Sequence, residues 1–455
     1  MDSDRRRLLV VPGSVRVSRR GFVRAVAAIA AASAGRHALA EPPADRVRAT
    51  SGDPVEPKWD EHLTVTVGPA KADLVGGDHR VLQAAVDYVA ALGGGTVKIL
   101  PGTFRLRNAV YLKSKVRLFG SGEETILFKE PSISAKLAAD SDWYDQEITL
   151  ADAQGFQVGD GVCLRTRNPH HGGTDVAKRT LVARSGKRFK LDRALRENFW
   201  LQGDTTVSTL FPILSGEHVA DVVIENLALD GNRAANANLD GNHAGCIFLQ
   251  DCNRITIRNV TARNYNGDGI SWQIAHDVLV ENCRSQDHAG LGLHPGSGSQ
   301  RTVMRGNRIA RNSIGIFFCW GVKFGLAEGN RIEECQCGVS LGHRDTDNVV
   351  RGNTILRSGQ VGVLFRPERG KDFAAHRNRI EGNRIEDTGK EDGVAIDVQG
   401  PTEEIAIVGN ELVETRGPAQ RIAIRVGPET RDVHLADNRV QGFAVPVADL
   451  RPHKP

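Results

Sequence analysis

The sequence predicts an all-β solenoid, in which the chain winds into stacked coils of short strands. One pattern recurs five times between residues 253 and 369: an asparagine, a few polar residues, and a short apolar run introduced by glycine. Each run alternates apolar and variable positions, which is the period of a strand, and no repeat has enough apolar residues for a helix as well. Such repeats bury their apolar faces only by stacking. The asparagines lie 23 to 25 residues apart, at Asn259, Asn282, Asn307, Asn330 and Asn353.

Alignment of the repeats predicts three ladders of equivalent residues. Because the side chains of a strand alternate between its faces, two apolar columns are expected to point inward. The asparagines form a third ladder, since an asparagine amide can bond its equivalent in the next coil and asparagine tolerates a left-handed turn. The first apolar column is Ile270, Leu291, Ile316, Val339, Val363 and Val394. The second is Trp272, Leu293, Phe318, Leu341, Phe365 and Ile396. The asparagine ladder extends to Asn226 upstream and to Asn383, Asn410 and Asn438 downstream.

The first forty residues are expected to be an export signal rather than part of the fold. Residues 18–23 resemble a twin-arginine motif, residues 25–34 form an alanine-rich run, and residues 38–40 make a cleavage site. This signal predicts a periplasmic or extracellular protein. Residues 41–75 include Pro42, Pro43, Pro54 and Pro57 and are expected to be a linker.

Charge and composition limit the classes of partner. The signal segment has eight arginines and two aspartates, so the rest of the chain is near −2 although the whole chain is +4. Overall basicity therefore gives no argument for nucleic-acid binding. No other run approaches the ~18 apolar residues of a membrane span. The seven cysteines are expected to be small buried hydrophobic residues. Nothing in the sequence indicates an oligomeric state.

Residues 76–135 are expected to form an N-terminal cap and the first coils. An amphipathic helix is predicted at residues 81–92, and three glycines end it at 93–95. A solenoid needs such a cover over its open first coil. Short strands should follow at residues 96–100, 103–106, 110–112 and 116–119.

Residues 136–214 interrupt the repeat and predict a small β module inserted between early coils. The coils then resume over residues 215–450, and residues 451–455 form a tail. A polar loop at residues 230–245 could overhang the surface of the coils. The pair His170–His171 in the module is expected to lie in a solvated loop rather than bind a metal.

The helix followed by Gly-Gly-Gly-Thr-Val, together with the repeats, resembles the pectate-lyase-like superfamily. The resemblance covers about residues 75–450 and implies a right-handed parallel β-helix with an N-terminal capping helix. It does not select an activity, because that superfamily includes lyases, hydrolases, epimerases and binding proteins.

Polar and aromatic side chains follow the apolar runs of consecutive coils. Equivalent residues of neighbouring coils stack ~4.8 Å apart, so the register predicts that these side chains line one face. Like cations stacked on a ladder repel each other, so function explains this concentration better than stability does. The catalytic candidates are Asp268, Asp287, His288, His294, His343, Arg344 and Arg366. The candidates for substrate binding are Gln273, Trp320, Lys323 and Asp345.

A uronate lyase or C-5-epimerase would account for the histidines and arginines. Either reaction needs a base that removes the C5 proton and a cation that stabilises the anion formed. His294 or His343 could be the base, and Arg344 or Arg366 the cation. Because the net charge near −2 offers no general attraction, a local cationic cleft should bind the acidic polysaccharide. We expect Asp268, His294, His343 and Arg344 to converge in that cleft.

Two short segments resemble motifs of related enzymes. Residues 264–268 partly resemble the Tyr-x-x-Asp core of mannuronan C-5-epimerases, although Ile270 stands where those enzymes have a histidine. Residues 266–270 are similar to the polygalacturonase motif Asn-x-Asp-Gly-Ile. A glycoside hydrolase needs two carboxylates roughly 5 to 9.5 Å apart, which Asp268 and Asp287 could provide. The third alternative is a carbohydrate-binding or surface β-helix protein without catalysis.

The only cofactor that the sequence suggests is a calcium ion. Asp345, Asp347 and Glu368 could supply oxygen ligands, although their spacing is not that of a known calcium loop. The sequence contains no zinc spacing, phosphate loop or nucleotide fingerprint.

Overall fold

A computed structural model describes residues 56–367 and 370–452. The chain divides into a unit of residues 1–43 and a unit of residues 44–455, and only the second contains described residues. The expected export signal and residues 41–55 of the expected linker lie outside the described residues, as does Glu368.

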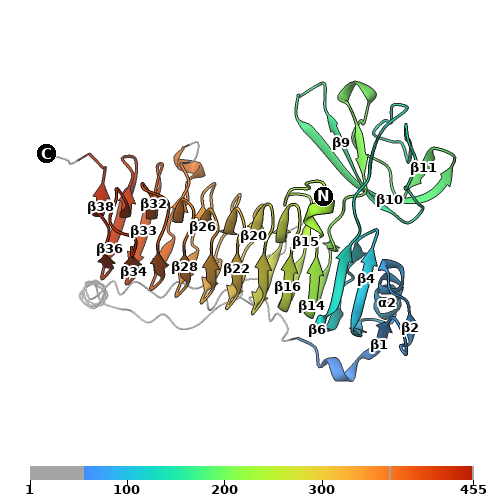
Figure 1. The fold of residues 1–455 in the computed structure, drawn as a ribbon, viewed down its shortest axis with the longest axis horizontal. Coiled ribbons are helices and arrows are strands. Elements are labelled where there is room, and N and C mark those ends of the chain that lie inside the picture. The colour runs from blue at the N-terminus through green and yellow to red at the C-terminus, as the bar shows by residue number, and fades with distance from the viewer. Residues whose placement is uncertain (1–55, 368–369, 453–455) are drawn as a thin grey trace, which may run out of the picture. The chain divides into compact units, whose positions relative to one another are not determined.

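The second unit is a parallel β-helix. A central coil contributes one strand to an 11-stranded sheet and two strands to a 21-stranded sheet, and every strand pairs in parallel with its equivalent in the next coil. Figure 1 shows these strands stacked in chain order, from green through orange. The predicted all-β solenoid is therefore confirmed.

The β-helix contains the strands of two sheets, and the described residues include five helical segments. The 11-stranded sheet contains β5 (Val110–Tyr111), β13 (Leu214–Glu217), β15 (Gly245–Gln250), β17 (Asp268–Gln273), β20 (Leu291–Gly296), β23 (Ile314–Phe317), β26 (Cys337–Leu341), β29 (Val361–Phe365), β32 (Val394–Val398), β35 (Ile422–Val426) and β38 (Val445–Asp449). The 21-stranded sheet contains β1 (Leu63–Gly68), β2 (Leu74–Val75), β3 (Gly95–Ile99), β4 (Gly102–Leu106), β6 (Val116–Lys129), β14 (Ala220–Asp230), β16 (Asn253–Arg263), β18 (His276–Glu281), β19 (Arg284–Gln286), β21 (Val303–Arg305), β22 (Arg308–Ala310), β24 (Leu326–Glu328), β25 (Arg331–Glu333), β27 (Val349–Arg351), β28 (Thr354–Leu356), β30 (Arg379–Glu381), β31 (Arg384–Glu386), β33 (Glu403–Val408), β34 (Glu411–Val413), β36 (Arg431–Ala436) and β37 (Arg439–Gln441). The helices are η2 (Trp59–Glu61), α2 (His79–Ala91), η3 (Leu201–Gly203), η4 (Arg233–Ala235) and η5 (Lys371–Phe373).

The inward apolar ladder confirms the predicted face but corrects the register. Trp272 and Leu293 are both fully buried. However, Leu293 pairs with Ile270, so the predicted partner Leu291 is wrong by two residues. The same slip affects β32, where Ile396 rather than Val394 pairs with Val363.

Glycine alignment explains this slip. The sequence Gly-Leu-Gly-Leu at residues 290–293 offers two glycines for one position, and the structure uses Gly292. A Cβ on Gly292 would lie 2.6 Å from the carbonyl oxygen of Gly315 in the next coil. Gly315 stands in the same relation to Gly338, again at 2.6 Å. The coils therefore approach too closely at this position for any larger residue.

Some asparagines form the amide ladder and others occupy a left-handed bend, although the repeat predicted both roles for each of them. Asn307 donates from Nδ2 to Oδ1 of Asn330 at 2.9 Å, and equivalent bonds continue along the later coils. Asn259 and Asn282 instead take the left-handed bend position, with φ of 52° and 53°. In the coil of Asn282, the next residue, Cys283, takes the ladder position and donates its N–H to Asn307 Oδ1. The predicted single ladder is thus wrong for the earlier coils.

The N-terminal cap contains more structure than expected. Asp78 caps α2 by accepting from the N–H groups of Arg80 and Val81, and α2 ends before Gly93, whose φ is 93°. Residues 63–68, expected to belong to the linker, form β1 and pair with β3. The alternating pattern Leu-Thr-Val-Thr-Val was a strand signal, and the nearby prolines concealed it.

The interruption of the repeat contains a separate six-stranded sheet. Its strands are β7 (Ser134–Lys136), β8 (Glu147–Thr149), β9 (Gly161–Arg167), β10 (Thr174–Ser185), β11 (Arg188–Leu191) and β12 (Thr206–Ser208). The sheet has its own apolar core, which includes Phe156, Phe189 and Phe199. Asp160 of this module accepts two hydrogen bonds from the Arg107 guanidinium, at 2.7 and 2.8 Å.

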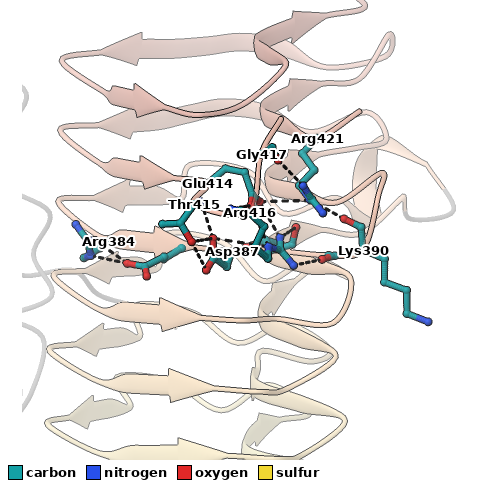
Figure 2. A network of polar contacts seen from close by, with 11 residues as sticks. Arg384, Asp387, Lys390, Glu414, Thr415, Arg416, Gly417 and Arg421 are labelled. Carbon is teal, nitrogen blue, oxygen red and sulfur yellow. Dashed lines mark hydrogen bonds and ion pairs between the residues drawn. The ribbon is translucent and has the colours of Figure 1, made fainter. Parts of the chain in front are cut away.

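Buried ion pairs fix the turns of the later coils. Figure 2 shows the network around Glu414, whose side chain is fully buried. Arg416 lies 2.7 Å from this carboxylate and also donates to the carbonyl of Gly389. Arg421 lies 3.4 Å from the same carboxylate. These contacts hold the turns of two successive coils together.

Two further observations concern the cysteines and the helices. None of the seven cysteines forms a disulfide with a described residue, and all but Cys319 are buried. Within residues 56–367 and 370–452, no helix has the length and apolar character to span a membrane.

Candidate functional site

The 11-stranded sheet carries three of the predicted site residues, Asp268, Gln273 and His294, and Arg366 directly follows its strand β29. Its register is shifted in the same way as the inward ladder. Ser271 pairs with His294, and Leu364 pairs with Asp397. The predicted alignment of Leu293 with Trp272 would have placed His294 beside Gln273, which the observed pairing of His294 with Ser271 corrects, although both His294 and Gln273 remain on the outward face.

Asp268 and His294 form a buried pair. Asp268 Oδ2 lies 2.8 Å from His294 Nδ1, and each residue is only 3% exposed. The other oxygen of Asp268 accepts the N–H of Leu291 at 2.9 Å. An ionised Asp268 fixes the imidazole proton on Nδ1 and leaves the lone pair on Nε2. Among the described residues, His294 Nε2 is buried without a hydrogen-bond partner.

This pair is not part of a serine-nucleophile triad. Ser271 Oγ lies 3.3 Å from His294, but at Nδ1, the same nitrogen that Asp268 contacts. In a Ser-His-Asp triad the serine and the aspartate contact opposite ring nitrogens. The Asp268 and His294 arrangement instead resembles a general base with its orienting carboxylate, because Nε2 stays available for a proton.

The polar loop at residues 231–244 covers the pair. Ser271 donates from its hydroxyl to the carbonyl of Gly241 at 2.6 Å, and Gln273 donates to Ser271 at 3.1 Å. A Cβ on Gly241 would lie 1.5 Å from Asp268 Oδ2, so only glycine allows the loop to approach this closely. The expected overhanging loop thus seals the pair from solvent, and Gln273 supports the seal.

The side chain of Arg366 contacts residues of neighbouring coils near the pair of Asp268 and His294. Its guanidinium donates to Ser340 Oγ at 2.8 Å and to the carbonyl of Phe318 at 3.1 Å. It also lies 4.5 Å from the centroid of the Phe317 ring, and Phe317 contacts the His294 ring at 5.4 Å. Phe317 therefore separates the cation of Arg366 from the imidazole of His294.

Asp345 anchors two neighbouring turns. Its carboxylate accepts the N–H groups of Gly321, Val322 and Gly342 at 2.9 to 3.0 Å and lies 3.2 Å from Arg366. Burial raises the pKa of Asp345 to about 7, against the opposing effects of Arg366 and the backbone donors. Its oxygens are used within the fold, so the predicted role in binding substrate or calcium is replaced by a structural one.

The two turns that Asp345 joins carry an aromatic stack. Trp320 is 57% exposed, and its ring lies 3.7 Å from the His343 ring at an interplanar angle of 24°. His343 also contacts Phe373 edge to face, and the Arg344 guanidinium lies 4.1 Å from the centroid of that phenyl ring. Trp320, a predicted candidate for substrate binding, is thus an exposed aromatic residue at a turn.

The predicted site residues therefore form two clusters rather than one. The first is the pair of Asp268 and His294, and the second is the stack of Trp320 and His343 with Arg344. The chain of contacts through Phe317, Arg366 and Asp345 connects them. Asp268 and His294 are in contact, whereas His343 and Arg344 follow β26, two coils further along the stack, so the convergence of all four in one cleft stays a prediction.

Asp287 and Lys323 have other positions. Both oxygens of Asp287 bind the Arg311 guanidinium, at 2.6 and 2.8 Å, and the residue has the left-handed φ of a turn, 63°. Asp287 therefore stabilises a turn, rather than presenting the available carboxylate that the hydrolase alternative needs. Lys323 forms isolated β-bridges with Gln300 and Thr346. Burial raises the pKa of the Asp347 carboxyl, but Arg377, Thr346 and the charge of Lys323 together lower it below its usual value.

His288 is buried in the turn before β20. Its Nδ1 accepts the N–H of Tyr265 at 3.1 Å, and it is 2% exposed. Burial lowers the pKa of His288 to about 3. A neutral, enclosed imidazole of this kind supports the turn and is not placed to exchange protons with a substrate.

The pKa of His288 predicts a loss of stability in acid. The unfolded chain takes up this proton near pH 6.5, whereas the folded chain resists it down to about pH 3. The contribution of His288 is therefore complete above pH 6.5 and is lost as the pH falls toward 3. Between about pH 7 and about pH 4.5, the wild type should lose about 3 kcal/mol more than His288→Gln. Urea unfolding of both proteins measures this, and equal losses would contradict it.

Four residues of this face were not predicted: Ser271, Phe317, Ser340 and Phe373. Ser271, Phe317 and Ser340 alternate with the inward ladder residues, so a correct register would have found them. Phe373 belongs to η5 and had no repeat signal. Within the described part of the chain, no group of three or more His, Cys, Asp or Glu residues could hold a metal ion, and Asp347 pairs with Arg377 at 2.7 Å.

Comparisons with known proteins agree on the fold. A family model described as a right-handed β-helix region matches residues 224–370. The A-module of the Azotobacter vinelandii mannuronan C-5 epimerase AlgE4 is 17% identical, with a TM-score of 0.50 over 86% of this chain and 99% of that module. A structure titled glycoside hydrolase is 10% identical, with a TM-score of 0.53 over 84% of this chain and 97% of that one.

A third structure is the exopolygalacturonase of Thermotoga maritima, which is 12% identical with a TM-score of 0.49 over 87% of this chain and 89% of that one. No curated protein sequence matches the chain. The chain is thus an all-β right-handed parallel β-helix. At identities of 10 to 17%, these likenesses concern the fold alone.

Proposed function

We propose that this protein is a secreted enzyme that acts on a uronate-containing polysaccharide by a lyase or C-5-epimerase reaction. The observation that carries the proposal is the pair of Asp268 and His294. The carboxylate fixes Nδ1 at 2.8 Å, and Nε2 has no partner among the described residues. An imidazole held in one tautomer with a free lone pair is suited to general-base catalysis.

The reaction begins with proton transfer from carbon. His294 Nε2 takes the C5 proton of a uronate, and the electron pair moves onto the carboxyl group, where Arg366 stabilises the charge. If the oxygen at C4 then leaves with its bonding electrons, a C4–C5 double bond forms and the glycosidic bond breaks. If a proton instead returns to C5 from the opposite face, the sugar is epimerised and the chain stays intact.

Access to His294 requires movement of the covering loop. The imidazole is 3% exposed under the residues around Gly241, so the substrate must displace this loop. Closing such a loop over substrate excludes water, which strengthens the charge interactions of the reaction. The covered pair is therefore interpreted as the closed form of the site.

The aromatic stack supports polysaccharide binding beside the pair. The indole of Trp320 offers an exposed apolar face with His343 behind it, a surface suited to a sugar ring. The same observation also favours the second candidate function, a carbohydrate-binding β-helix protein without catalysis. The hydrolase alternative lacks comparable support, because Arg311 already occupies the Asp287 carboxylate.

A panel of acidic and neutral polysaccharides tests the proposal. Ultraviolet absorbance of unsaturated uronates with new reducing ends identifies a lyase, and inversion at C5 in the NMR spectrum without cleavage identifies an epimerase. Reducing ends without absorbance would indicate a hydrolase and contradict the proposal. Binding without any product would support the carbohydrate-binding alternative.

Export belongs to the same proposal, since polysaccharides of this kind lie outside the cytoplasm. The twin-arginine segment at residues 18–23 motivates it. Replacing Arg19 and Arg20 with lysine should leave the precursor in the cytoplasm, as measured by fractionation and immunoblotting. Normal export of this variant would contradict the proposed signal.

A further inference from the structure

Three arginines stack in register on the 21-stranded sheet. Arg284 of β19 pairs with Arg308 of β22, which pairs with Arg331 of β25. We call these three residues the arginine ladder. Side chains at such positions lie about 4.8 Å from one coil to the next, and like charges placed directly opposite destabilise a sheet.

A neighbouring ladder of the same sheet avoids this cost. Its strands β18, β21, β24, β27 and β30 pair in register with charges that alternate in sign. Arg305 lies 2.8 Å from Glu328, and Arg351 lies 2.6 Å from it. The order is Glu281, Arg305, Glu328, Arg351 and Glu381. In the arginine ladder, by contrast, no carboxylate stands between successive arginines of the column.

The arginine ladder lines a groove of about 550 Å³. Arg284 also borders a second hollow of about 390 Å³, so this side chain lines both. The side chains that line the first hollow are Arg284, Gln286, Arg308, Ile309, Ala310, Arg311, Arg331 and Glu333. Four cations therefore face this groove, and only one carboxylate does.

Internal ion pairs neutralise the groove only in part. Arg284 lies 3.4 Å from Glu123, and Arg331 pairs with Glu333. Arg311 pairs with Asp287, as described above. Arg308 forms no ion pair with any described residue, and it is exposed at the centre of the ladder. Arg308 is thus the ladder residue without a carboxylate partner among the described residues.

We propose that this groove binds a linear anionic polysaccharide that lies along the stack of coils and meets one arginine per coil. The regular spacing of the arginines matches a polymer with a repeating acid group better than it matches a single small anion. The lining contains no aromatic residue, whereas single-stranded nucleic acids are bound by stacking bases on aromatic side chains. This site lies on a different sheet from His294 and does not depend on the proposed reaction.

Binding of polygalacturonate by the full chain at low and high salt tests this proposal. Replacing all three ladder residues with glutamine should weaken the apparent Kd roughly tenfold, and Arg308→Gln alone should weaken it by about threefold. Salt should weaken wild-type binding as well, since exposed charges are screened. The matched control is Arg305→Gln, which removes the same charge from the alternating ladder of the same coil and should leave the Kd nearly unchanged.

A stability measurement separates ligand binding from a structural role. Because the ladder residues repel one another, Arg308→Glu should raise the thermal midpoint while it abolishes binding. The proposal is wrong if the triple variant binds as tightly as the wild type, or if Arg305→Gln weakens binding equally. It is also wrong if the wild type does not bind, or if a DNA oligonucleotide of equal charge competes as well as polygalacturonate. Loss of turnover in His294→Gln would not affect any of these outcomes.

Discussion

Replacing His294 with glutamine is expected to lower kcat on a uronate polysaccharide by about 100-fold or more. The glutamine side chain fits beside Asp268 but has no lone pair of sufficient basicity to take the C5 proton. Asp268→Asn should cause a loss of similar size, because a neutral amide no longer stabilises the imidazolium that forms. Steady-state kinetics on the substrate found in the panel measures both effects.

The matched control for this experiment is His343→Gln. His343 packs between Trp320 and Phe373, so its replacement should raise KM and leave kcat nearly unchanged. Thermal unfolding of all three variants verifies that the coils remain intact. Full activity of His294→Gln, or an equal loss of kcat in His343→Gln, would show that the base is not His294.

Replacing Asp345 with alanine is expected to destabilise the protein by about 4 kcal/mol. The buried N–H groups of Val322 and Gly342 and the half-buried N–H of Gly321 then lose their acceptor, and the Arg366 guanidinium loses its ion-pair partner. Because the carboxylate ties the turns of Trp320 and His343, substrate affinity should fall with stability.

Asp347→Ala provides the control, two residues away with the same substitution. Its partner Arg377 is half exposed, and a surface ion pair contributes about 0.5 kcal/mol. Urea unfolding should therefore separate the two variants clearly. If Asp345→Ala is as stable as Asp347→Ala, the anchoring role of Asp345 is wrong.

The fold was predictable because its repeating unit can be recognised in the sequence alone. The period of about 23 residues and the glycine before each apolar run indicate stacked coils. The alternation of apolar and variable residues places Trp272 and Leu293 on the inward face. The register of β20 could not be read from the sequence, because Gly290 and Gly292 both match the glycine that introduces each apolar run. Only the close approach of Gly292 to Gly315 of the next coil selects Gly292. The strand β1 was missed because the proline content around it outweighed its alternation.

The candidate site was predictable in its face but not in its contacts. The repeats placed Asp268, His294, Trp320 and Arg366 on one side of the coils. They did not reveal that residues near Gly241 seal the pair, because a loop has no repeat to align. The repeats also did not distinguish Asp345, which accepts hydrogen bonds from backbone N–H groups, from residues that point toward solvent.

The most direct test of the central claim is solvent deuterium exchange at C5. Polyuronate is incubated in D₂O with the wild type or with His294→Gln, and the C5 proton signal is followed by NMR. The account predicts that the wild type removes this proton, giving either deuterium at C5 or an unsaturated ring, and that His294→Gln does not. Chain cleavage with every C5 proton retained would contradict it.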